Sequence, residues 1–552
     1  MAALTRETFA GLTTAEQIVR LEQVDAKTRR ELILQSRNSV SLTRALSSEK
    51  LFYTLKEIGL ADAVDLLALA SPEQMRDMLD LDCWRKDTLD ERRVAAWLML
   101  LDEAGSGKLA EWALHADIEL LVLLVKRFLE VVRKIEVEED MNFDQSQYFT
   151  FDDQYLLRFI GEPEPILASV IERLRVLDYE NYRQVLEWSM LELESTLEED
   201  TLHWRNARLA DRGYPGYEQA QKLFRVVDVE SVSLDRFRRA TTPRVRYAAG
   251  EDLIFSDHAL MLLEVRDSLL VRALASLSGA VVEEIGQELA MLTNEAVVAQ
   301  ARDPGEVAEV KRCVEEVHDY VNIGLAYFAQ ENDSAAARLV REIRLRPFFQ
   351  VGFSLTTRLQ QYEHALQAVA RAHAGEAWET LLDTPFREAC AGVRRQPPMF
   401  FRGLDTPGEI FLRRFRDFAE VRRMERLLEQ IPLWFAVLNR CQLLPDHMSE
   451  QVSLATLWNT AFAHWTLAAQ VDVRPLTRAE FVAFRQGLRG TVLNDEQERF
   501  LAFLAAQASV STEERQALQV LAACARERLE EALSVNVEGT DLRFLEGLLV
   551  VG

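Results

Sequence analysis

The stretch "SPEQMRDMLDL" (Ser71–Leu81) has the pattern of a capped amphipathic helix, and "DYENYRQVLEW" (Asp178–Trp188) repeats that pattern later in the chain. Ser71 and Asp178 each carry a short side-chain oxygen that can accept from the N–H groups of a first helical turn. Gln74 follows Ser71 by three residues, which is the spacing of a capping box. We therefore expect a helix to begin directly after each of these two caps.

The two stretches also agree in their apolar positions at a constant offset. The matched pairs are Met75 with Tyr182, Met78 with Val185, and Leu79 with Leu186. The match extends upstream, where "ADAVDLLALA" (Ala61–Ala70) aligns with "ASVIERLRVL" (Ala168–Leu177). This indicates two amphipathic helices joined by a capped corner that occur twice, and such pairs stack to bury faces that one pair cannot bury alone.

The composition is that of a folded, multi-part helical chain. Its 552 residues exceed one hydrophobic core, and 48% of them are apolar. Only 22 Gly and 14 Pro interrupt the chain, and nearly every segment shows apolar residues three and four apart. The sequence therefore predicts an all-α fold with a stacked helical-repeat N-terminal domain and two further helical domains.

The domain boundaries are predicted where Gly and Pro gather. Such breaks occur at "RGYPGY" (Arg212–Tyr217), "ATTPRVRYAAGED" (Ala240–Asp252) and "RRQPPMFFRGLDTPGE" (Arg394–Glu409). We expect a helical-repeat domain over 1–212, a middle helical domain over 213–395 and a C-terminal helical domain over 396–552. No low-complexity linker separates them.

One segment has the alternation of strands. In "YFTFDDQYLLRF" (Tyr148–Phe159), Phe149, Phe151, Tyr155, Leu157 and Phe159 alternate with other residues, and Asp152-Asp153 can form the turn. A small β-hairpin near 148–159 is the alternative to helix here.

The charge balance and the cysteines restrict the partners and the compartment. The net charge is −25, whereas a surface that binds nucleic acid or anionic lipid needs clustered Lys and Arg. The five cysteines are far apart and never in a CxxC arrangement, which is typical of reduced thiols in a cytoplasm. No apolar run reaches the roughly 20 residues of a spanning helix. We expect a cytoplasmic protein that inserts in no membrane and binds no nucleic acid.

The segment "LSSEKLFYTLKEIGLADAVDLLALASPEQMRDMLDL" resembles the helical repeats in the cytoplasmic N-terminal domain of MgtE-type magnesium transporters. It is also similar to the middle domain of the flagellar rotor-switch protein FliG. The whole chain resembles an uncharacterised family of bacterial cytoplasmic proteins. The transporter resemblance spans about residues 41–212 and implies stacked helices and a response to divalent cations, but its cation-binding carboxylates match no particular residues here.

Two acid–histidine pairs have the helical spacing of metal ligands. Glu315 and His318 are three residues apart in "CVEEVHDY", and Asp200 and His203 repeat that spacing in "EEDTLHW". Carboxylate-bridged metal sites in helical bundles use such pairs, with two more carboxylates. A solvated or hydrogen-bonded face is the alternative interpretation of each pair.

The segment "DMNFDQSQYFTFDD" has the start of a calcium loop. Asp140, Asn142 and Asp144 occupy the first three ligand positions, but Gln145 replaces the required Gly and Phe151 replaces the bidentate Glu. The segment is better interpreted as an acidic connector, and loosely bound Mg²⁺ is the one cofactor that it allows.

Two further segments are partly similar to functional motifs. "DEAGSGKLAEW" (Asp102–Trp112) resembles a phosphate loop but lacks its first Gly and its Ser or Thr after Lys108, so we expect a turn between helices. "FLRRFRDFAEVRRMERLLEQI" (Phe411–Ile431) contains six arginines, but these interleave with acids around an apolar stripe that includes Phe411. RNA binding is the alternative for this segment.

The sequence contains no recognisable catalytic motif, and we predict no catalytic residue and no cofactor-binding residue. A nucleophile triad assembled from distant residues stays open, because spacing cannot exclude it. The predicted function is that of a non-enzymatic cytoplasmic scaffold or regulatory protein that binds a protein partner. The alternatives are a divalent-cation-responsive regulator, and an enzyme with a metal or acid/base site that the sequence does not reveal.

Overall fold

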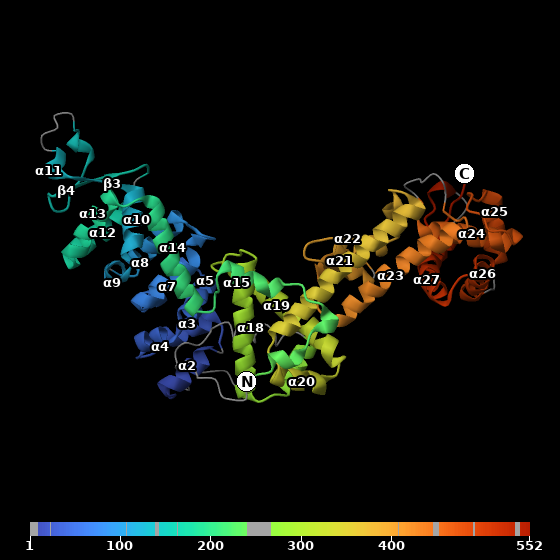
Figure 1. The fold of residues 1–552 in the computed structure, drawn as a ribbon, viewed down its shortest axis with the longest axis horizontal. Helices are drawn as coiled ribbons and strands as arrows, with labels where there is room; N and C mark the ends of the chain where they lie inside the picture. The colour runs from blue at the N-terminus through green and yellow to red at the C-terminus, as the bar shows by residue number, and fades with distance from the viewer. Residues whose placement is uncertain are drawn as a thin grey trace. The chain divides into compact units, whose positions relative to one another are not determined.

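The computed structural model describes residues 9–22, 24–105, 107–137, 143–162, 164–239, 267–406, 408–444, 452–488, 492–535 and 541–551. Over these residues α-helices dominate, and the strands form three two-stranded antiparallel pairs. The predicted all-α class with small hairpins is therefore confirmed (Figure 1).

The chain divides into two compact units. Unit 1 comprises Met1–Arg225, Ser233–Val321 and Phe328–Gln350, and unit 2 comprises Val226–Val232, Asn322–Tyr327 and Val351–Gly552. The predicted boundary at residue 212 falls inside unit 1.

The helices up to residue 221 are α2 (Thr14–Glu22), α3 (Ala26–Leu34), α4 (Ser39–Ala45), α5 (Ser48–Ile58), α6 (Val64–Leu67), α7 (Pro72–Asp82), α8 (Glu91–Glu103), α9 (Lys108–His115), α10 (Ile118–Phe128), α11 (Lys134–Val137), α12 (Pro165–Leu177), α13 (Tyr179–Leu191), α14 (Glu194–Asp211) and α15 (Tyr217–Gln221). The later helices are α17 (Leu269–Ala275), α18 (Gly279–Ala299), α19 (Val307–Ala329), α20 (Asp333–Glu342), α21 (Arg346–Ala374), α22 (Phe386–Val393), α23 (Phe418–Arg440), α24 (Leu454–Ala468), α25 (Arg478–Gly487), α26 (Leu493–Ala508) and α27 (Thr512–Ser534). The strands are β1 (Trp84–Arg85), β2 (Thr88–Leu89), β3 (Leu129–Arg133), β4 (Tyr155–Phe159), β5 (Met399–Phe401) and β6 (Leu412–Arg414).

Both predicted helix caps are present. The Ser71 hydroxyl accepts from the Gln74 N–H at 3.2 Å, and the Gln74 side chain accepts from the Ser71 N–H at 2.9 Å, which completes a capping box at the start of α7. The Asp178 carboxylate accepts from the Asn181 N–H at 3.1 Å at the start of α13. These bonds satisfy first-turn donors that otherwise have no intrahelical acceptor.

The matched apolar positions of α7 and α13 are equally buried. Leu79 is 4% exposed and Leu186 is 0% exposed, and both Met78 and Val185 are at 0%. Helix α7 packs on α5 and α9, whereas α13 packs on α10 and α12. Because α12 also packs on α8 and α9, the stack continues from α5 to α13, as Figure 1 shows in blue to teal.

The upstream members of the two predicted pairs differ. Ala168–Leu177 lies in the 13-residue helix α12, but Ala61–Ala70 forms a 3₁₀ turn (Leu60–Ala63) and the four-residue helix α6. Gly59 ends α5 with a φ of +109°, and Ser71 begins the next corner, so only a short segment lies between them. The two helix pairs are therefore similar in structure in their second helices, α7 and α13, and differ in their first members.

The strand signal near 148–159 is confirmed in part of its length. Asp153 has a φ of +62° in the predicted turn, and Phe149 and Leu157 form an antiparallel bridge. The main partner of β4 is instead β3, with Val131 opposite Leu157. The sequence did not indicate β3, because its partner β4 lies far along the chain.

Unit 2 has its core among its long helices. Helix α27 packs on α23, α24 and α26. The Trp434 indole N–H donates to the Ala517 carbonyl at 2.7 Å, and Trp458 packs edge-to-face on Phe500 with ring centroids 5.2 Å apart. Over the described residues of the whole chain, no helix is both long and apolar enough to cross a membrane.

Candidate functional site

Helix α7 carries three acidic side chains into the interior of unit 1. Asp77, Asp80 and Asp82 are 2%, 6% and 3% exposed. A buried carboxylate is costly unless a cation or several donors compensate it. The partners of these three side chains therefore define a charged part of the core.

The compensating cations of Asp77 and Asp80 come from α14. Arg205 and Arg208 lie on α14 and Arg212 is its C-cap, and the spacing of three and four residues brings all three to one face. Arg208 donates to both oxygens of Asp80, at 2.6 and 3.0 Å. Arg212 binds Asp77 and, at 3.0 Å, Glu49 of α5. These ion pairs attach α14 to the stack.

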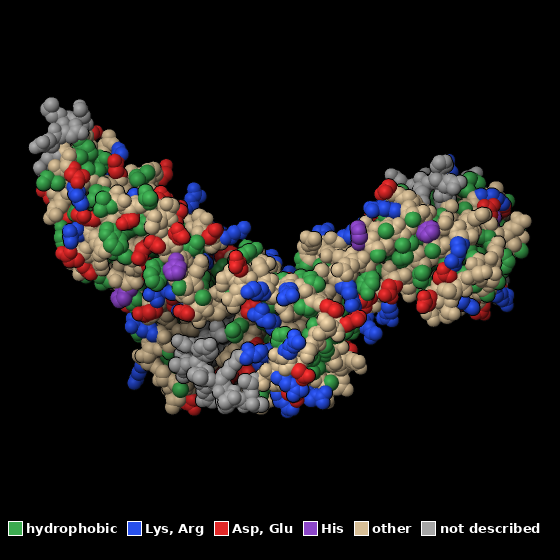
Figure 2. All heavy atoms as spheres, viewed as in Figure 1, with side chains coloured by type: hydrophobic (Ala, Val, Ile, Leu, Met, Phe, Trp, Pro, Cys, Tyr) green, Lys and Arg blue, Asp and Glu red, His purple; other side chains and the backbone are tan. Residues whose placement is uncertain are grey.

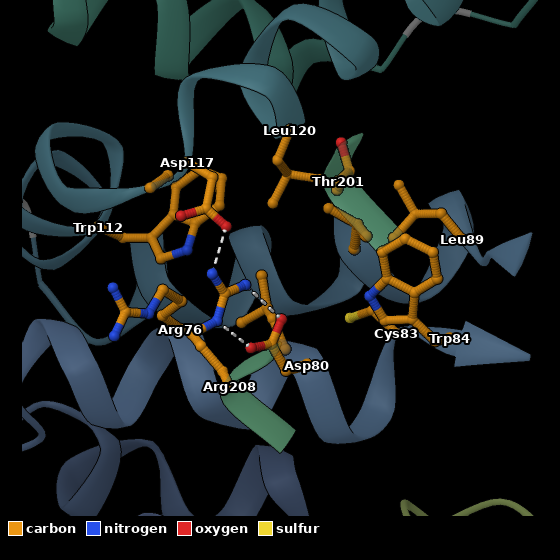
Figure 3. Close-up of a pocket in the computed structure, with 13 residues that line it drawn as sticks. Arg76, Asp80, Cys83, Trp84, Leu89, Trp112, Asp117, Leu120, Thr201 and Arg208 are labelled. Carbon is orange, nitrogen blue, oxygen red and sulfur yellow. Dashed lines mark hydrogen bonds and ion pairs between the residues drawn. The ribbon is translucent and has the colours of Figure 1, made fainter. Parts of the chain in front are cut away.

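Arg208 lies beside a small cavity between α7, α9 and α14 (Figure 3). Its guanidinium also binds the Asp117 carboxylate at 2.8 Å, and Trp84 and Trp112 contribute to the wall. The cavity volume is about 10 Å³, which is room for about one water molecule. The arrangement therefore positions charges inside the protein and leaves no space for a substrate.

The ionisation of these groups follows their burial and pairing. Burial raises the pKa of the Asp80 carboxyl, although the bond from Arg208 opposes this. Burial lowers the pKa of Arg205 to about 10. Burial acts in the same direction on Arg208, but its bond and charge pairing with Asp80 and Asp117 outweigh burial and raise its pKa.

A second charged cluster surrounds Asp82. Its carboxylate accepts from Lys56 at 2.7 Å, from Arg93 at 3.0 Å and from the Trp97 indole N–H at 2.8 Å. Arg93 also binds Asp303 at 3.1 Å. The cluster therefore connects the N-terminal stack to the segment that precedes α19.

Backbone contacts reinforce that connection. The Tyr53 hydroxyl donates to the Pro304 carbonyl at 2.7 Å. At Gly305, a Cβ atom would lie 2.4 Å from the Asp82 Oδ1 atom and 3.2 Å from its Cα atom. Only glycine permits this approach, so the two segments are fitted together closely.

Neither charged cluster was predicted from the sequence. The signals were present as three arginines at helical spacing on α14 and as acids within the apolar pattern of α7. Periodicity identifies a buried face by its apolar residues, so a charged residue on that face is assigned to the surface. The partners of these charges are distant in sequence, and only the fold brings them together.

The predicted metal ligands meet no full ligand set. Over the described residues, no group of three or more His, Cys, Asp or Glu side chains is placed to hold a metal ion. Asp140 lies outside the described residues, and Asp144 caps a short turn by accepting from the Ser146 N–H at 3.1 Å. Metal binding at Glu315 and His318, or at Asp140 and Asp144, stays a prediction.

His318 takes part in a different arrangement. Its Nε2 atom lies 3.0 Å from the Ser268 hydroxyl, and its Nδ1 atom lies 3.0 Å from the Asp319 carboxylate. With the ring proton on Nδ1, Ser268 donates to the imidazole and the imidazole donates to Asp319. This is the order of hydrogen bonds in acyl-transfer enzymes. The sequence could not indicate it, because Ser268 is 50 residues from His318.

The same array is closed to substrates in its present conformation. Ser268, His318 and Asp319 are 9%, 2% and 3% exposed. Ser268 also caps α17 by accepting from the Val271 N–H at 3.3 Å. As it stands, the array joins the start of α17 to the middle of α19.

The segment similar to a phosphate loop and the arginine-rich segment both have structural roles. The segment from Asp102 to Trp112 connects α8 to α9, as predicted, and the Lys108 ammonium donates to the Ala70 carbonyl at 2.6 Å. In the arginine-rich segment, Arg413 binds Glu420 at 2.5 Å and Arg423 binds Asp405 at 2.7 Å. Phe411 was wrongly placed in the apolar stripe, because it lies before β6 and is 53% exposed.

The fold and the site define an all-α protein of stacked helices in which buried ion pairs join α7 to the segments packed on it. The sequence profile of the Family of unknown function (DUF6178) matches residues 6–551, and the chain belongs to this family. No curated protein and no solved structure matches the chain significantly. The resemblance to the magnesium transporters therefore rests on the quoted sequence pattern alone.

Proposed function

We propose that the protein is a non-enzymatic cytoplasmic scaffold or regulatory protein that binds a protein partner through the outer surface of α8–α14. The observation that carries this proposal is the charge of the segment. Residues 101–200 contain 24 Asp and Glu but nine Lys and Arg. Most of the net charge of the chain therefore belongs to this part of the stack.

Seven of the nine Lys and Arg side chains in that segment are paired with acids. Ion pairs with acids are formed by Lys108, Arg127, Arg133, Lys134, Arg158, Arg173 and Arg183. The surplus is therefore carboxylate, and Glu172, Glu192 and Glu199 are examples at the surface. Figure 2 shows Asp and Glu side chains interleaved with apolar ones over the visible face of this part.

Apolar side chains accompany this charge at the surface. Examples in the segment that are at least 48% exposed are Ile135, Ile160, Leu191 and Leu193. A partner that covers a leucine gains about 1.5–3 kcal/mol for full burial. An acidic surface with apolar side chains favours a basic protein partner and disfavours nucleic acid and anionic membranes.

The compartment is part of the same proposal. None of the five cysteines forms a disulfide, and burial raises the pKa of Cys390 and of Cys524 to about 12. Thiols of this kind are protonated and inert at neutral pH. Such thiols suit a reducing cytoplasm.

Affinity purification of the tagged full-length protein from native lysate tests the proposal. We expect a partner that co-purifies in near-stoichiometric amount and is released by high salt, because screening weakens exposed charge pairs. A bait with Glu172, Glu192 and Glu199 changed to Gln is the control and should retain less of it. Recovery of the bait alone under gentle, low-salt conditions would contradict the proposal.

An acyl-transferring enzyme is the second candidate, and the Ser268–His318–Asp319 array favours it. In such a reaction the Ser268 oxygen attacks the carbonyl carbon of an ester while its proton passes to His318 Nε2. The leaving alcohol then takes that proton as the ester C–O bond breaks. Water releases the acid from the serine and restores the hydroxyl proton.

A fluorophosphonate probe separates the two candidates. An activated serine displaces fluoride and gains the phosphonyl mass, which intact-protein mass spectrometry detects. The scaffold proposal predicts no adduct on the folded protein. An adduct on Ser268 that His318→Gln abolishes, and that Ser453→Ala at another helix cap leaves in place, would establish the enzyme instead.

A further inference from the structure

We infer that the corner between α13 and α14 is the docking surface for a basic amphipathic segment of the partner protein. This inference rests on the proposed function and specifies its site. The corner surface consists of the apolar side chains Leu191 and Leu193 with the carboxylates Glu192, Glu194 and Glu198.

The two leucines are exposed on a well-held backbone. Leu191 and Leu193 are each 70% exposed, and one residue separates them. From residue 191 to 200, Leu197 is the one buried side chain. The Glu192 N–H donates to the Trp188 carbonyl at 2.8 Å, and the Leu197 N–H donates to the Leu193 carbonyl at 3.2 Å. The leucines are therefore presented outward by helix ends whose positions are fixed.

A contact from the neighbouring helix fixes the corner further. The Lys126 ammonium of α10 donates to the Ser189 carbonyl at 3.0 Å. Arg127, the next residue, binds Glu194 at 2.8 Å and also binds Glu198. A surface that is ordered before binding loses little conformational entropy when a partner docks.

The charge around the corner is negative even with Arg127 included. Arg127 also binds Glu91 of α8 at 2.5 Å, so one guanidinium serves three carboxylates. Residues 191–200 contain five acids and no Lys or Arg. A docking segment must therefore bring positive charge with it.

Another exposed apolar side chain follows β4, where the backbone is bonded to the end of α10. Ile160 is 48% exposed, and its N–H donates at 2.8 Å to the carbonyl of Phe128, which follows Arg127. Glu162 follows two residues later and is exposed. Apolar side chains with carboxylates beside them complement a segment in which Leu- or Ile-type anchors alternate with Lys or Arg.

Fluorescence anisotropy with a synthetic probe tests the surface on the full-length protein. The probe is a labelled amphipathic peptide of Leu and Lys, and its matched control replaces each Leu by Ser at the same charge. We expect the Leu–Lys peptide to bind at least about tenfold more tightly than the control peptide. The double variant Leu191→Ser/Leu193→Ser should lose about tenfold in affinity for it.

The matched protein control is Val176→Ser/Leu177→Ser at the corner between α12 and α13. These two side chains are 68% and 53% exposed, so the substitution removes similar apolar surface elsewhere. Its affinity should stay within about twofold of wild type. Equal loss in both variants, or no loss in the first, would overturn the inference. Melting temperatures near that of wild type will show that both variants are folded.

Co-purification distinguishes a wrong docking surface from a wrong proposed function. If the native partner co-purifies equally with wild type and with Leu191→Ser/Leu193→Ser, the protein binds a partner but uses another surface. If no partner co-purifies, the proposed function itself fails. A second copy of this chain as the occupant would appear as a dimer in light scattering that the same double variant abolishes.

Discussion

Arg208 binds Asp80 of α7 on one side and Asp117 on the other, in a largely buried part of unit 1. The attraction between such charges is strong at low dielectric, but each charge has lost its hydration. The net stabilisation of the pair is therefore small compared with the cost of removing one member. This asymmetry makes the cluster a sensitive indicator of correct packing.

The first prediction follows from this asymmetry. Arg208→Met should destabilise unit 1 by about 3–5 kcal/mol, because it leaves the Asp80 carboxylate buried without its main cation. The double variant Asp80→Leu/Arg208→Met should be more stable than the single one. Urea unfolding followed by tryptophan fluorescence measures both.

Arg183→Met is the control for this prediction. Arg183 pairs with Glu180 at 3.0 Å on the surface of α13, where side chains of both residues are well exposed. Exposed pairs contribute less than about 1 kcal/mol. If Arg183→Met lowers the stability as much as Arg208→Met does, burial of the α7–α14 cluster does not explain the loss of stability in Arg208→Met.

At the scale of helices, the similarity between α7 and α13 gives the second prediction. Leu79→Ala and Leu186→Ala should each cost about 2–5 kcal/mol, because each leaves a cavity in the same stack. Glu73→Ala and Glu180→Ala lie on the exposed faces and should each cost less than about 1 kcal/mol. Thermal and urea unfolding of the four variants measures these losses. If Leu186→Ala leaves the stability unchanged while Leu79→Ala unfolds the protein, the sequence similarity between α7 and α13 is coincidental.

The third prediction concerns the cap of α25. Glu480 forms a capping box with Thr477 and binds Arg474 at 2.6 Å, and the bond from Arg474 is the main reason that its pKa falls to about 2. A lowered pKa stabilises the folded state above pH 4.5, the ordinary value, and this contribution disappears as the pH falls towards 2.

Glu480→Gln keeps the capping geometry and removes the charge. Wild type should therefore melt above Glu480→Gln at neutral pH, and the gap should shrink below pH 4.5 and close near pH 2. Melting followed by circular dichroism across this pH range measures the gap. A gap that stays constant down to pH 2 would show that the charge of Glu480 is not its source.

The sequence predicted the helices more readily than their contacts. The signals for the helices are local: they are the caps Ser71 and Asp178 and the apolar residues that follow each cap. The hydrogen bonds that form these helices also join residues close in sequence. β3 was missed because its partner β4 is 22 residues away along the chain. The α7–α14 cluster and the Ser268–His318–Asp319 array were missed for the same reason. Their residues are placed by tertiary packing, which no local spacing encodes.

At the scale of the whole molecule, charge is distributed unevenly along the chain. Residues 351–500 contain 18 Asp and Glu and 18 Lys and Arg, whereas residues 101–200 have a large acidic excess. A charge that served only solubility would need no such concentration. The uneven distribution therefore supports partner binding by unit 1 rather than a general role of the acidic composition.

The fourth prediction addresses the cation-responsive alternative. A regulator that binds Mg²⁺ selectively when folded would gain stability by mass action. We expect instead that millimolar Mg²⁺ and NaCl of matched ionic strength raise the melting temperature equally, because the acids act through screening. Differential scanning fluorimetry in the two salts measures both shifts. A clearly larger shift with Mg²⁺ would favour a cation sensor.

Site-specific photo-crosslinking in living cells locates the surface at which a partner binds this protein. A photoreactive amino acid replaces Leu193 in one strain and Val176 in another. We expect one discrete adduct from position 193, to a protein segment in which Lys and Arg outnumber Asp and Glu, and little crosslinking from position 176. No adduct at position 193, or identical adducts at the two positions, would contradict the claim that this protein acts by binding a partner at the α13–α14 corner.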